Sequence, residues 1–343
     1  MYRRAPRVAL AIVAMAMVVP QGKAVAEELR LVGSGAAFPF PIYSVWFKDF
    51  SEIHSGVTID YQPKGSGAGI EDFIYNIVDF AGSGAAMTDE QIVKVANGVV
   101  LLPITAGELV LAYNLPESPK VLKLPRDVYP DIFLGKITKW NDPRIGAANP
   151  GLTLPDLQIT VVARSDASGA TFMFTRHLSA VSDDFARTIG HGMTVQWPLG
   201  GSMLAAPLSD GVTATIKQIQ GAIGYIEYGY AKLTKTDWAL LQNKTGAYVA
   251  PGAKSGTAAL ASAVLDADLR GWVDDPGGPD AYPIAAFTWL LAHKKQDAKK
   301  AEWMRRLVDY CVTTGQSIAD STGYIPLPAN VVAKIQAAST HIQ

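Results

Sequence analysis

One local pattern occurs four times in this chain and limits what the chain can fold into: a short apolar strand, a loop of small residues and a helical run. Units of this kind build α/β sheets, in which each helix begins near the carboxyl end of the preceding strand. We therefore predict an α/β protein whose four loops meet at a sheet edge, where such sheets bind ligands. The loops are residues 33–38 (GSGAAF), 65–69 (GSGAG), 82–86 (GSGAA) and 164–170 (RSDASGA).

The fourth unit carries the strongest chemical signal. It follows a predicted strand at residues 157–163 and opens a predicted helix at residues 171–180. A helix start has unpaired N–H groups and a partial positive charge, which suit an anion, and Arg164 adds a planar fork of donors that matches an oxyanion. Ser168 and Thr171 offer hydroxyl donors, and Gly169 allows close approach to the backbone. The alternative is an ordinary capped helix with a surface arginine.

The other units predict further elements. Strands are expected at residues 29–32, 57–62 and 79–81, with helices at residues 42–53 and 70–78. Thr88 and Gln91 have the spacing of a capping box that starts another helix. Near the end of the chain, residues 284–290 predict a strand and residues 298–312 an amphipathic helix.

Several functional classes lack their motifs. The chain contains no P-loop, no convincing dinucleotide fingerprint and no G-x-S-x-G nucleophile elbow. Its histidines are scattered without metal-ligand spacing, so we predict no catalytic residues, metal site or cofactor. A formal net charge of -1 argues against nucleic-acid binding, which needs a basic face. The single cysteine, Cys311, is expected to be a buried hydrophobic residue.

The N-terminus predicts secretion. Arg3, Arg4 and Arg7 precede a short apolar run at residues 8–19, and residues 24–26 (AVA) fit a cleavage site. We therefore expect a cleavable signal peptide at residues 1–26 and a periplasmic location of the Gram-negative type. The alternative is an uncleaved anchor. The remaining length of this 343-residue chain allows two domains.

Taken in order, these segments resemble the substrate-binding proteins of phosphate ABC transporters, the PstS type. The resemblance extends from Leu31 almost to the C-terminus and is carried by motifs that occur in the family's order. They are residues 33–41, 65–67, 78–81 (VDFA), 134–142 (LGKITKWND), 164–169 (RSDASG), 221–228 (GAIGYIEY), 282–284 (YPI) and 323–328 (GYIPLP).

The resemblance implies a two-lobed periplasmic-binding-protein fold of type II, with central mixed sheets flanked by helices and a two-strand hinge near Thr105 and Ala285. The first lobe would comprise residues 27–105 and 286–343, and the second lobe residues 106–285. The implied function is to capture inorganic phosphate between the lobes and deliver it to the permease subunits of an inner-membrane ABC transporter. We expect a monomer that is not an enzyme. By resemblance, the phosphate contacts are Ala37, Phe38, Ser66, Gly84, Arg164, Ser168, Gly169 and Ala170.

Three of these positions depart from the family pattern. The family usually has threonine at the position of Ala37, aspartate at that of Gly84 and threonine at that of Ala170. The aspartate accepts the proton that phosphate carries at neutral pH, and it repels sulfate. Its loss leaves two alternatives open: backbone N–H groups still hold phosphate, or the ligand is another oxyanion or an organic phosphate ester.

Two charged residues add to this uncertainty. Lys64 and Glu108 stand where the family usually has an uncharged residue and a glycine. They could pair with each other, be solvated or line the cleft, where Glu108 could replace the missing proton acceptor. Functions from other classes also remain possible, namely a secreted hydrolase on the same scaffold and a phosphate-sensing or regulatory protein.

Overall fold

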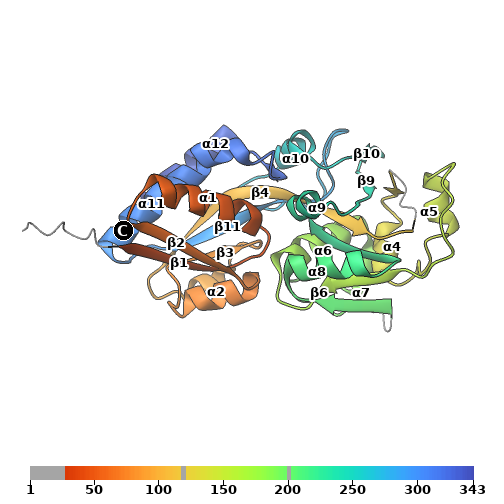
Figure 1. Cartoon of the computed structure of the whole chain (residues 1–343), viewed down its shortest axis with the longest axis horizontal. Helices are drawn as coiled ribbons and strands as arrows, with labels where there is room; N and C mark the ends of the chain where they lie inside the picture. Colours follow the sequence, from red (N-terminus) through yellow and green to blue (C-terminus); the bar gives the residue numbers. More distant parts are fainter. Residues whose placement is uncertain (1–27, 117–120, 199–201) are drawn as a thin grey trace, which may run out of the picture.

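The computed structural model describes residues 28–116, 121–198 and 202–343 (Figure 1). The predicted signal peptide therefore lies outside the described residues. Within these ranges no helix is both long enough and apolar enough to span a membrane. The molecule is elongated, and strand β4 runs along its middle from one end group of elements to the other (Figure 1).

A mixed sheet forms the core of the described chain. Its strands follow the order β2-β1-β3-β11-β4-β8-β6-β7, and β12 also pairs with β4. β1 is parallel to β2 and β3, whereas β11 is antiparallel to both of its neighbours. The strands are β1 (Leu29–Gly35), β2 (Val57–Pro63), β3 (Phe80–Ser83), β4 (Val99–Tyr113), β6 (Thr160–Arg164), β7 (Met203–Ala206), β8 (Ala222–Glu227), β11 (Ala285–His293) and β12 (Tyr324–Ile325), with β5 (Lys123–Leu124), β9 (Leu240–Gln242) and β10 (Tyr248–Val249) in a separate small sheet.

Strand β4 divides the molecule into two halves. All of its 15 residues are buried. Its first part pairs with β11, up to the Glu108–Ala285 pair, and its last part pairs with β8, from Leu109 to Tyr113. We call the group around β1, β2, β3 and β11 the β1 half, and the group around β6, β7 and β8 the β6 half. A strand shared in this way joins two sheets without a flexible linker.

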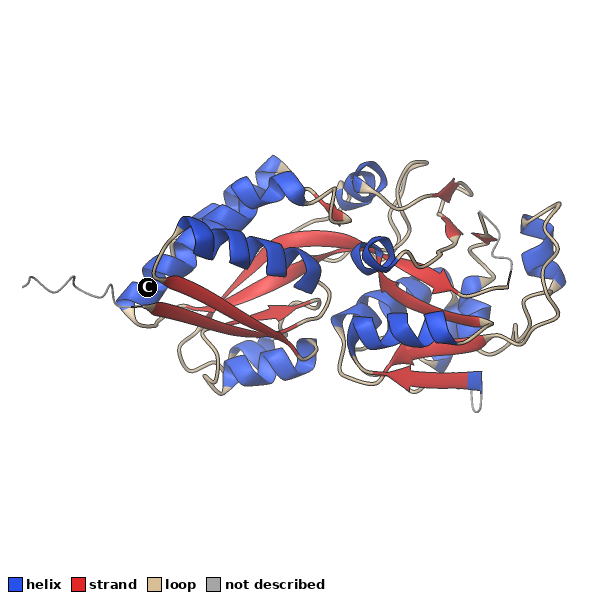
Figure 2. Ribbon diagram, in the orientation of Figure 1, coloured by secondary structure: helices blue, strands red, loops and turns tan. Residues whose placement is uncertain are grey.

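Helices cover both faces of the sheets (Figure 2). In the β1 half, α1 packs on β2, α2 on β1 and β3, and α11 and α12 on β4; in the β6 half, α8 packs on β6 and β8, and α6 on β8. The helices are α1 (Phe40–Ile53), α2 (Ser66–Ile74), α3 (Asp89–Ile92), α4 (Tyr129–Phe133), α5 (Pro143–Ala148), α6 (Gly169–Val181), α7 (Asp183–Thr188), α8 (Leu208–Gln218), α9 (Tyr228–Thr234), α10 (Ala253–Leu260), α11 (Ala298–Val312), α12 (Ala329–Ser339) and the 3-10 helix η2 (Thr314–Ile318).

The observed helix limits test the limits that were predicted from local sequence patterns. The predicted helix at residues 298–312 is confirmed as α11, and Thr88 and Gln91 form the predicted capping box at the start of α3. The limits predicted for the helix at residues 70–78 are wrong, because α2 begins at Ser66 and ends at Ile74. It ends early because Asn76 adopts a left-handed conformation, with φ 57°, that an α-helix cannot contain.

The segment between α10 and β11 contacts both halves. α10 packs on β11 and β12, and the indole N–H of Trp289 in β11 donates to the Leu269 carbonyl at 2.9 Å. A few residues later, Asp274 binds Arg176 of α6 in the β6 half. The lobe limits expected at residues 105 and 285 stay a prediction.

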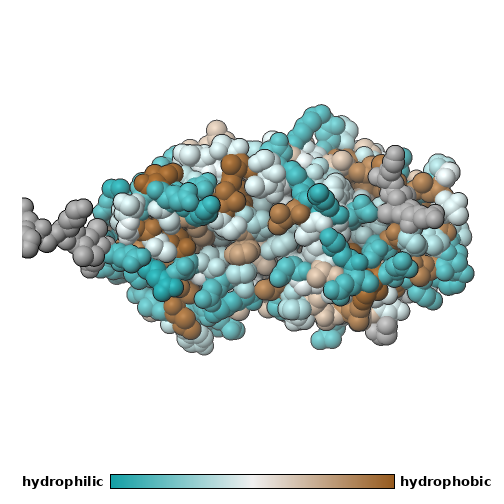
Figure 3. All heavy atoms as spheres, viewed as in Figure 1, coloured by the Kyte–Doolittle hydropathy of each residue, from teal (hydrophilic) through white to brown (hydrophobic). Residues whose placement is uncertain are grey.

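The surface is mixed in polarity. On the face shown in Figure 3, hydrophobic residues form small separate groups among hydrophilic ones, over both halves. The described residues of that face therefore form no broad apolar patch, and the apolar content of the chain lies mainly in its buried core.

Candidate anion-binding site

The start of α6 is built for hydrogen bonding. β6 ends at Arg164, and four residues later Ser168 caps the helix: its hydroxyl oxygen accepts the N–H groups of Ala170 at 3.1 Å and Thr171 at 3.3 Å. Serine suits this position because its short side chain reaches the free N–H groups of the first turn. Ser168 and Ala170 are both buried. The predicted loop between strand and helix is therefore present, and its end at the helix start is buried.

Three of the predicted loops meet at Ser66. Its hydroxyl oxygen accepts the N–H of Gly84 at 3.0 Å and the N–H of Gly169 at 3.1 Å. Gly84 follows β3 in the β1 half, and Gly169 begins α6 in the β6 half. The oxygen of an anion accepts hydrogen bonds in the same way, so N–H groups from both halves already point at one shared acceptor.

The halves touch directly at this point. A Cβ atom on Gly169 would lie only 2.4 Å from the Cα atom of Gly84, so no larger residue fits at position 169. Close by, the N–H of Gly67 donates to the Ala167 carbonyl at 3.0 Å. Gly65 has a left-handed φ of +94°, and a Cβ atom there would lie 2.4 Å from an Asp166 carboxylate oxygen. The structure is therefore closed at the loops.

Arg164 is the buried cation of the site. Its side chain is only 3% exposed. Its Nε and Nη2 atoms donate to the two oxygens of Asp166 at 2.8 and 2.6 Å, and Nη1 donates to the Ser209 hydroxyl at 3.1 Å. These bonds use three of its five N–H groups and leave one on each terminal nitrogen for a further acceptor. In this structure the bidentate partner of Arg164 is Asp166, and the expected contact of Arg164 with an anion stays a prediction.

The charges of this pair stabilise each other. Burial acts to raise the pKa of Asp166, but the hydrogen bonds and positive charge of Arg164 outweigh burial and hold that pKa below its usual value. The N–H of Leu208 also donates to Asp166, at 2.9 Å. Asp166 is therefore ionised at neutral pH and fixes the orientation of the guanidinium.

Ala37 and Phe38 lie beside α9 and β12. Both are 2% exposed, and their carbonyl oxygens accept the hydroxyls of Tyr230 at 3.2 Å and Tyr324 at 2.6 Å. Thr171, one place after Ala170, has its hydroxyl 2.7 Å from that of Tyr225. The methyl groups of Ala37 and Ala170 offer no donors, so these two positions bring only backbone groups to the site.

Sequence reasoning missed the groups that hold Arg164 in place. Asp166 stood two residues away in the same motif, which was a usable signal. Tyr225 accepts the Arg164 N–H at 3.2 Å, and Ser209 donates to Glu227 at 2.9 Å, yet all three lie far along the chain. The motif at residues 221–228 contains Tyr225 and Glu227, but no pattern in the sequence indicated their contact with the Arg164 loop.

The two unusual charges have separate partners. Lys64 lies 2.9 Å from Asp72, so pairing of Lys64 with Glu108 is wrong. Glu108 is 1% exposed, so solvation is also wrong, and its carboxylate accepts the Gly252 N–H at 2.7 Å and the Ser255 hydroxyl at 3.0 Å. Burial raises the pKa of Glu108 to about 8 despite these bonds. Glu108 therefore binds the start of α10.

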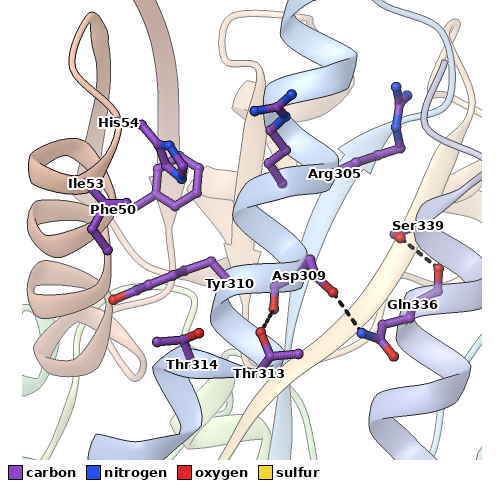
Figure 4. A pocket seen from close by; sticks show the side chains of 11 residues that line it. Phe50, Ile53, His54, Arg305, Asp309, Tyr310, Thr313, Thr314, Gln336 and Ser339 are labelled. Atoms are coloured by element: carbon purple, nitrogen blue, oxygen red, sulfur yellow. Dashed lines mark hydrogen bonds between the residues drawn. The ribbon is translucent and has the colours of Figure 1, made fainter.

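A surface pocket in the β1 half differs from the proposed anion site in the residues that line it. It measures about 600 Å³ and lies between α1, α11 and α12 (Figure 4). It is lined by the last turns of α1 and α11, where helices carry partial negative charge. Asp309 adds a carboxylate, which accepts the Gln336 amide at 2.7 Å. Arg305 and Arg306 also line this pocket, so its charges are mixed. Because α1, α11 and α12 meet it with their last turns, no α-helix of the described chain faces it with its start, and the start of α6 remains the better anion site.

Comparison with known proteins agrees with this geometry. A family model described as the PBP superfamily domain matches residues 19–314. The phosphate-binding protein PstS of Pasteurella multocida is 39% identical over 317 residues, which cover 91% of this chain and 90% of that protein. The chain belongs to the PstS family. PstS of Haemophilus influenzae is 36% identical over 315 residues, which cover 91% of this chain and 92% of that protein. The resemblance predicted from the motifs is confirmed.

Solved structures support the fold. A high-affinity periplasmic phosphate-binding protein (PfluDING), solved with phosphate, has a TM-score of 0.75 at 22% identity, and the match covers 90% of this chain and 93% of that one. A phosphate-binding protein from Stenotrophomonas maltophilia has a TM-score of 0.67 at 19% identity, covering 90% and 94%. At these identities the likeness shows the fold alone, and it confirms the predicted two-lobed α/β class.

Proposed function

We propose that this PstS-family chain captures inorganic phosphate between its two halves and delivers it to the permease subunits of an ABC transporter. Relatives that cover most of the chain are named phosphate-binding proteins, and one solved neighbour is described as a putative phosphate ABC transporter substrate-binding protein. The chain then acts in the periplasm, as a monomer, after removal of a signal peptide. It binds phosphate without transforming it.

The observation that carries this proposal is the convergence at Ser66. N–H groups from both halves reach one acceptor there, beside the start of α6 and the capped loop that Arg164 opens. A helix start and a guanidinium together are a general arrangement for binding a tetrahedral oxyanion. Here the first three N–H groups of α6 donate to the hydroxyls of Ser66 and Ser168, and an anion would take the place of these acceptors. Ala37, Phe38, Ser66, Gly84, Arg164, Ser168, Gly169 and Ala170 are the proposed contact residues.

Capture requires movement. The closed contact between Gly84 and Gly169 leaves no room even for a methyl group, so an anion enters only when the halves separate. β4 and β11 are the strands that pass from one half toward the other, and bending there would open the loops. The proposed lobes are residues 27–105 with 286–343, and residues 106–285, with α10 as a contact between them.

A different oxyanion or a phosphate ester is the second candidate, and a specific feature favours it. Positions 37, 84 and 170 carry neither a hydroxyl nor a carboxyl group, so the site has fewer groups that select by protonation state. The proposed phosphate contacts at these positions come from the backbone.

The anion that copurifies with the protein tests this proposal. Native mass spectrometry of the mature chain should show one bound phosphate per molecule, and mild unfolding followed by dialysis should remove it. A copurifying sulfate or phosphate ester would favour the second candidate, whereas a chain that carries no anion and binds none would contradict both. A colorimetric assay with phosphate esters should show no turnover; steady release of phosphate would indicate a hydrolase.

A further inference from the structure

A buried acid lies behind the proposed anion site. Glu227, at the end of β8, is 1% exposed, and its Oε1 atom accepts the Ser209 hydroxyl at 2.9 Å. The same hydroxyl oxygen accepts Nη1 of Arg164 at 3.1 Å. Ser209 therefore connects the acid to the cation. The other carboxyl oxygen of Glu227, Oε2, is buried and has no hydrogen-bond partner among the described residues.

An ionised Glu227 would be unfavourable here. A buried carboxylate oxygen without a donor loses its hydration and gains nothing in return. Burial accordingly raises the pKa of Glu227, and this outweighs the opposing charge of Arg164 and the Ser209 hydroxyl. The neutral acid carries no charge that has lost its hydration, so its burial costs less. The geometry thus favours the protonated form of Glu227.

The local charges make this proton relevant to anion binding. Arg164 is already neutralised by its bidentate partner Asp166. If Glu227 were also ionised, the three groups would carry a net charge of 1 − 2 = −1, which repels an incoming anion in a site of low dielectric. Lys64, which directly precedes the Gly65–Ser66 loop in the sequence, is paired with Asp72. With Glu227 protonated, the three groups are neutral.

We propose that Glu227 is a proton-carrying positioning residue, and that capture of the anion beside Arg164 stabilises the proton on its carboxyl group. This inference rests on the proposed function. Coupling is reciprocal, so a proton on Glu227 tightens anion binding and a bound anion draws a proton from solvent onto Glu227. Affinity is then highest where Glu227 is protonated in the anion-free protein, and it falls as rising pH ionises that form.

The groups packed around Glu227 do not supply an alternative proton. Arg164 stays charged, Asp166 stays ionised, and burial raises the pKa of Tyr230 far above neutrality. Tyr324 is likewise held neutral by burial. Asp210 lies farther out, where it affects Tyr230. Among the described groups that face this acid, Glu227 is the one whose ionisation can change with anion binding.

Calorimetric titration with inorganic phosphate, in buffers of different ionisation enthalpy, counts the protons taken up per anion. Wild type and Glu227→Gln are compared from mildly acidic to mildly alkaline pH. Phosphate itself exchanges the same protons in both titrations, so the difference between the two proton counts reports on Glu227 alone. Wild type should take up more protons per bound phosphate than Glu227→Gln does, by up to one proton. As pH rises, the phosphate affinity of wild type should fall further than that of Glu227→Gln, by about tenfold for each unit by which the anion raises the pKa of Glu227. Equal proton counts at every pH would overturn the inference.

Two further variants sharpen the test. Glu108→Gln removes another buried acid of raised pKa, one that binds α10 instead of Ser209, so its proton count should equal that of wild type. Ser209→Ala keeps Glu227 but removes the donor that favours its ionised form, so the extra uptake should move to higher pH. If Glu227→Gln does not fold, the inference is overturned by a Ser209→Ala protein whose proton uptake occurs in the same pH range as that of wild type. Absence of any phosphate binding by wild type would instead contradict the proposed function.

Discussion

Arg164 has two tasks at the site, since the guanidinium that would face the anion also neutralises Asp166. Arg164→Ala should weaken phosphate binding by well over tenfold, because it removes a charge-assisted contact from a buried site. It also leaves the half-buried Asp166 without its cationic partner, which should lower the melting temperature while the fold persists. Arg164→Lys keeps the charge but not the fork, and should bind with intermediate affinity. The exposed Arg306→Ala is the control, and an Arg164→Ala protein of unchanged affinity would place the anion elsewhere.

Gly84 is the proposed contact residue that we expect to set the proton chemistry of the site. Without a carboxylate at this position, we expect a smaller preference for phosphate over sulfate than in relatives that have aspartate there. Gly84→Asp should partly restore the preference, by about tenfold, the value of a hydrogen bond to a charged group. A Cβ atom here would lie 3.0 Å from the Gly169 Cα, so Gly84→Ala is needed as the steric control. Competition binding with both anions measures this, and Glu108→Gln should leave the preference unchanged. Strong rejection of sulfate by wild type would contradict the expectation.

The first turn of α6 connects local capping with binding. Ser168→Ala should lower the free energy of unfolding by about 0.5–2 kcal/mol, as for other lost helix caps. Ser182 caps α7 in the same manner, by accepting the Phe185 N–H, and lies outside the proposed site. Ser182→Ala should therefore cost similar stability and leave phosphate affinity unchanged, whereas Ser168→Ala should weaken affinity as well. Denaturant unfolding measures the stability of both variants, and calorimetry measures their phosphate affinity. Equal phosphate affinities of Ser168→Ala and Ser182→Ala would show that Ser168 does not contribute to the site.

Elements with strong local signals could be predicted from the sequence. The helix at residues 298–312 and the capping box of Thr88 and Gln91 depend on residues close in the chain, and both are correct. The end of α2 was mispredicted because apolar residues continue past Ile74 while Asn76 turns the backbone. At the site, the loops were visible as motifs. The network through Ser209, Tyr225 and Glu227 was not, because tertiary contacts alone bring these residues to Arg164.

At the scale of the whole molecule, Glu108 lies where β4 changes partners, and its ionisation should affect global stability. Its pKa is raised from 4.5 to about 8, so the folded protein binds this proton more tightly than the unfolded chain does. Stability from this proton is complete below about pH 4.5 and is lost as pH rises to about 8. Glu108→Gln cannot ionise, so its unfolding free energy should fall less across that range. Parallel pH profiles of the two proteins would show that the pKa of Glu108 is not raised in the folded state.

The central claim is that two halves joined through β4 close on one phosphate at the start of α6. Calorimetric titration of phosphate into the mature chain, first freed of any copurified anion, tests it most directly. We predict saturable binding of one phosphate per chain and a higher melting temperature in its presence, because ligand binds the folded form. In Arg164→Ala we predict affinity weaker by well over tenfold and a smaller rise in melting temperature. Absence of phosphate binding by the folded wild-type chain, or binding that Arg164→Ala leaves intact, would contradict the account.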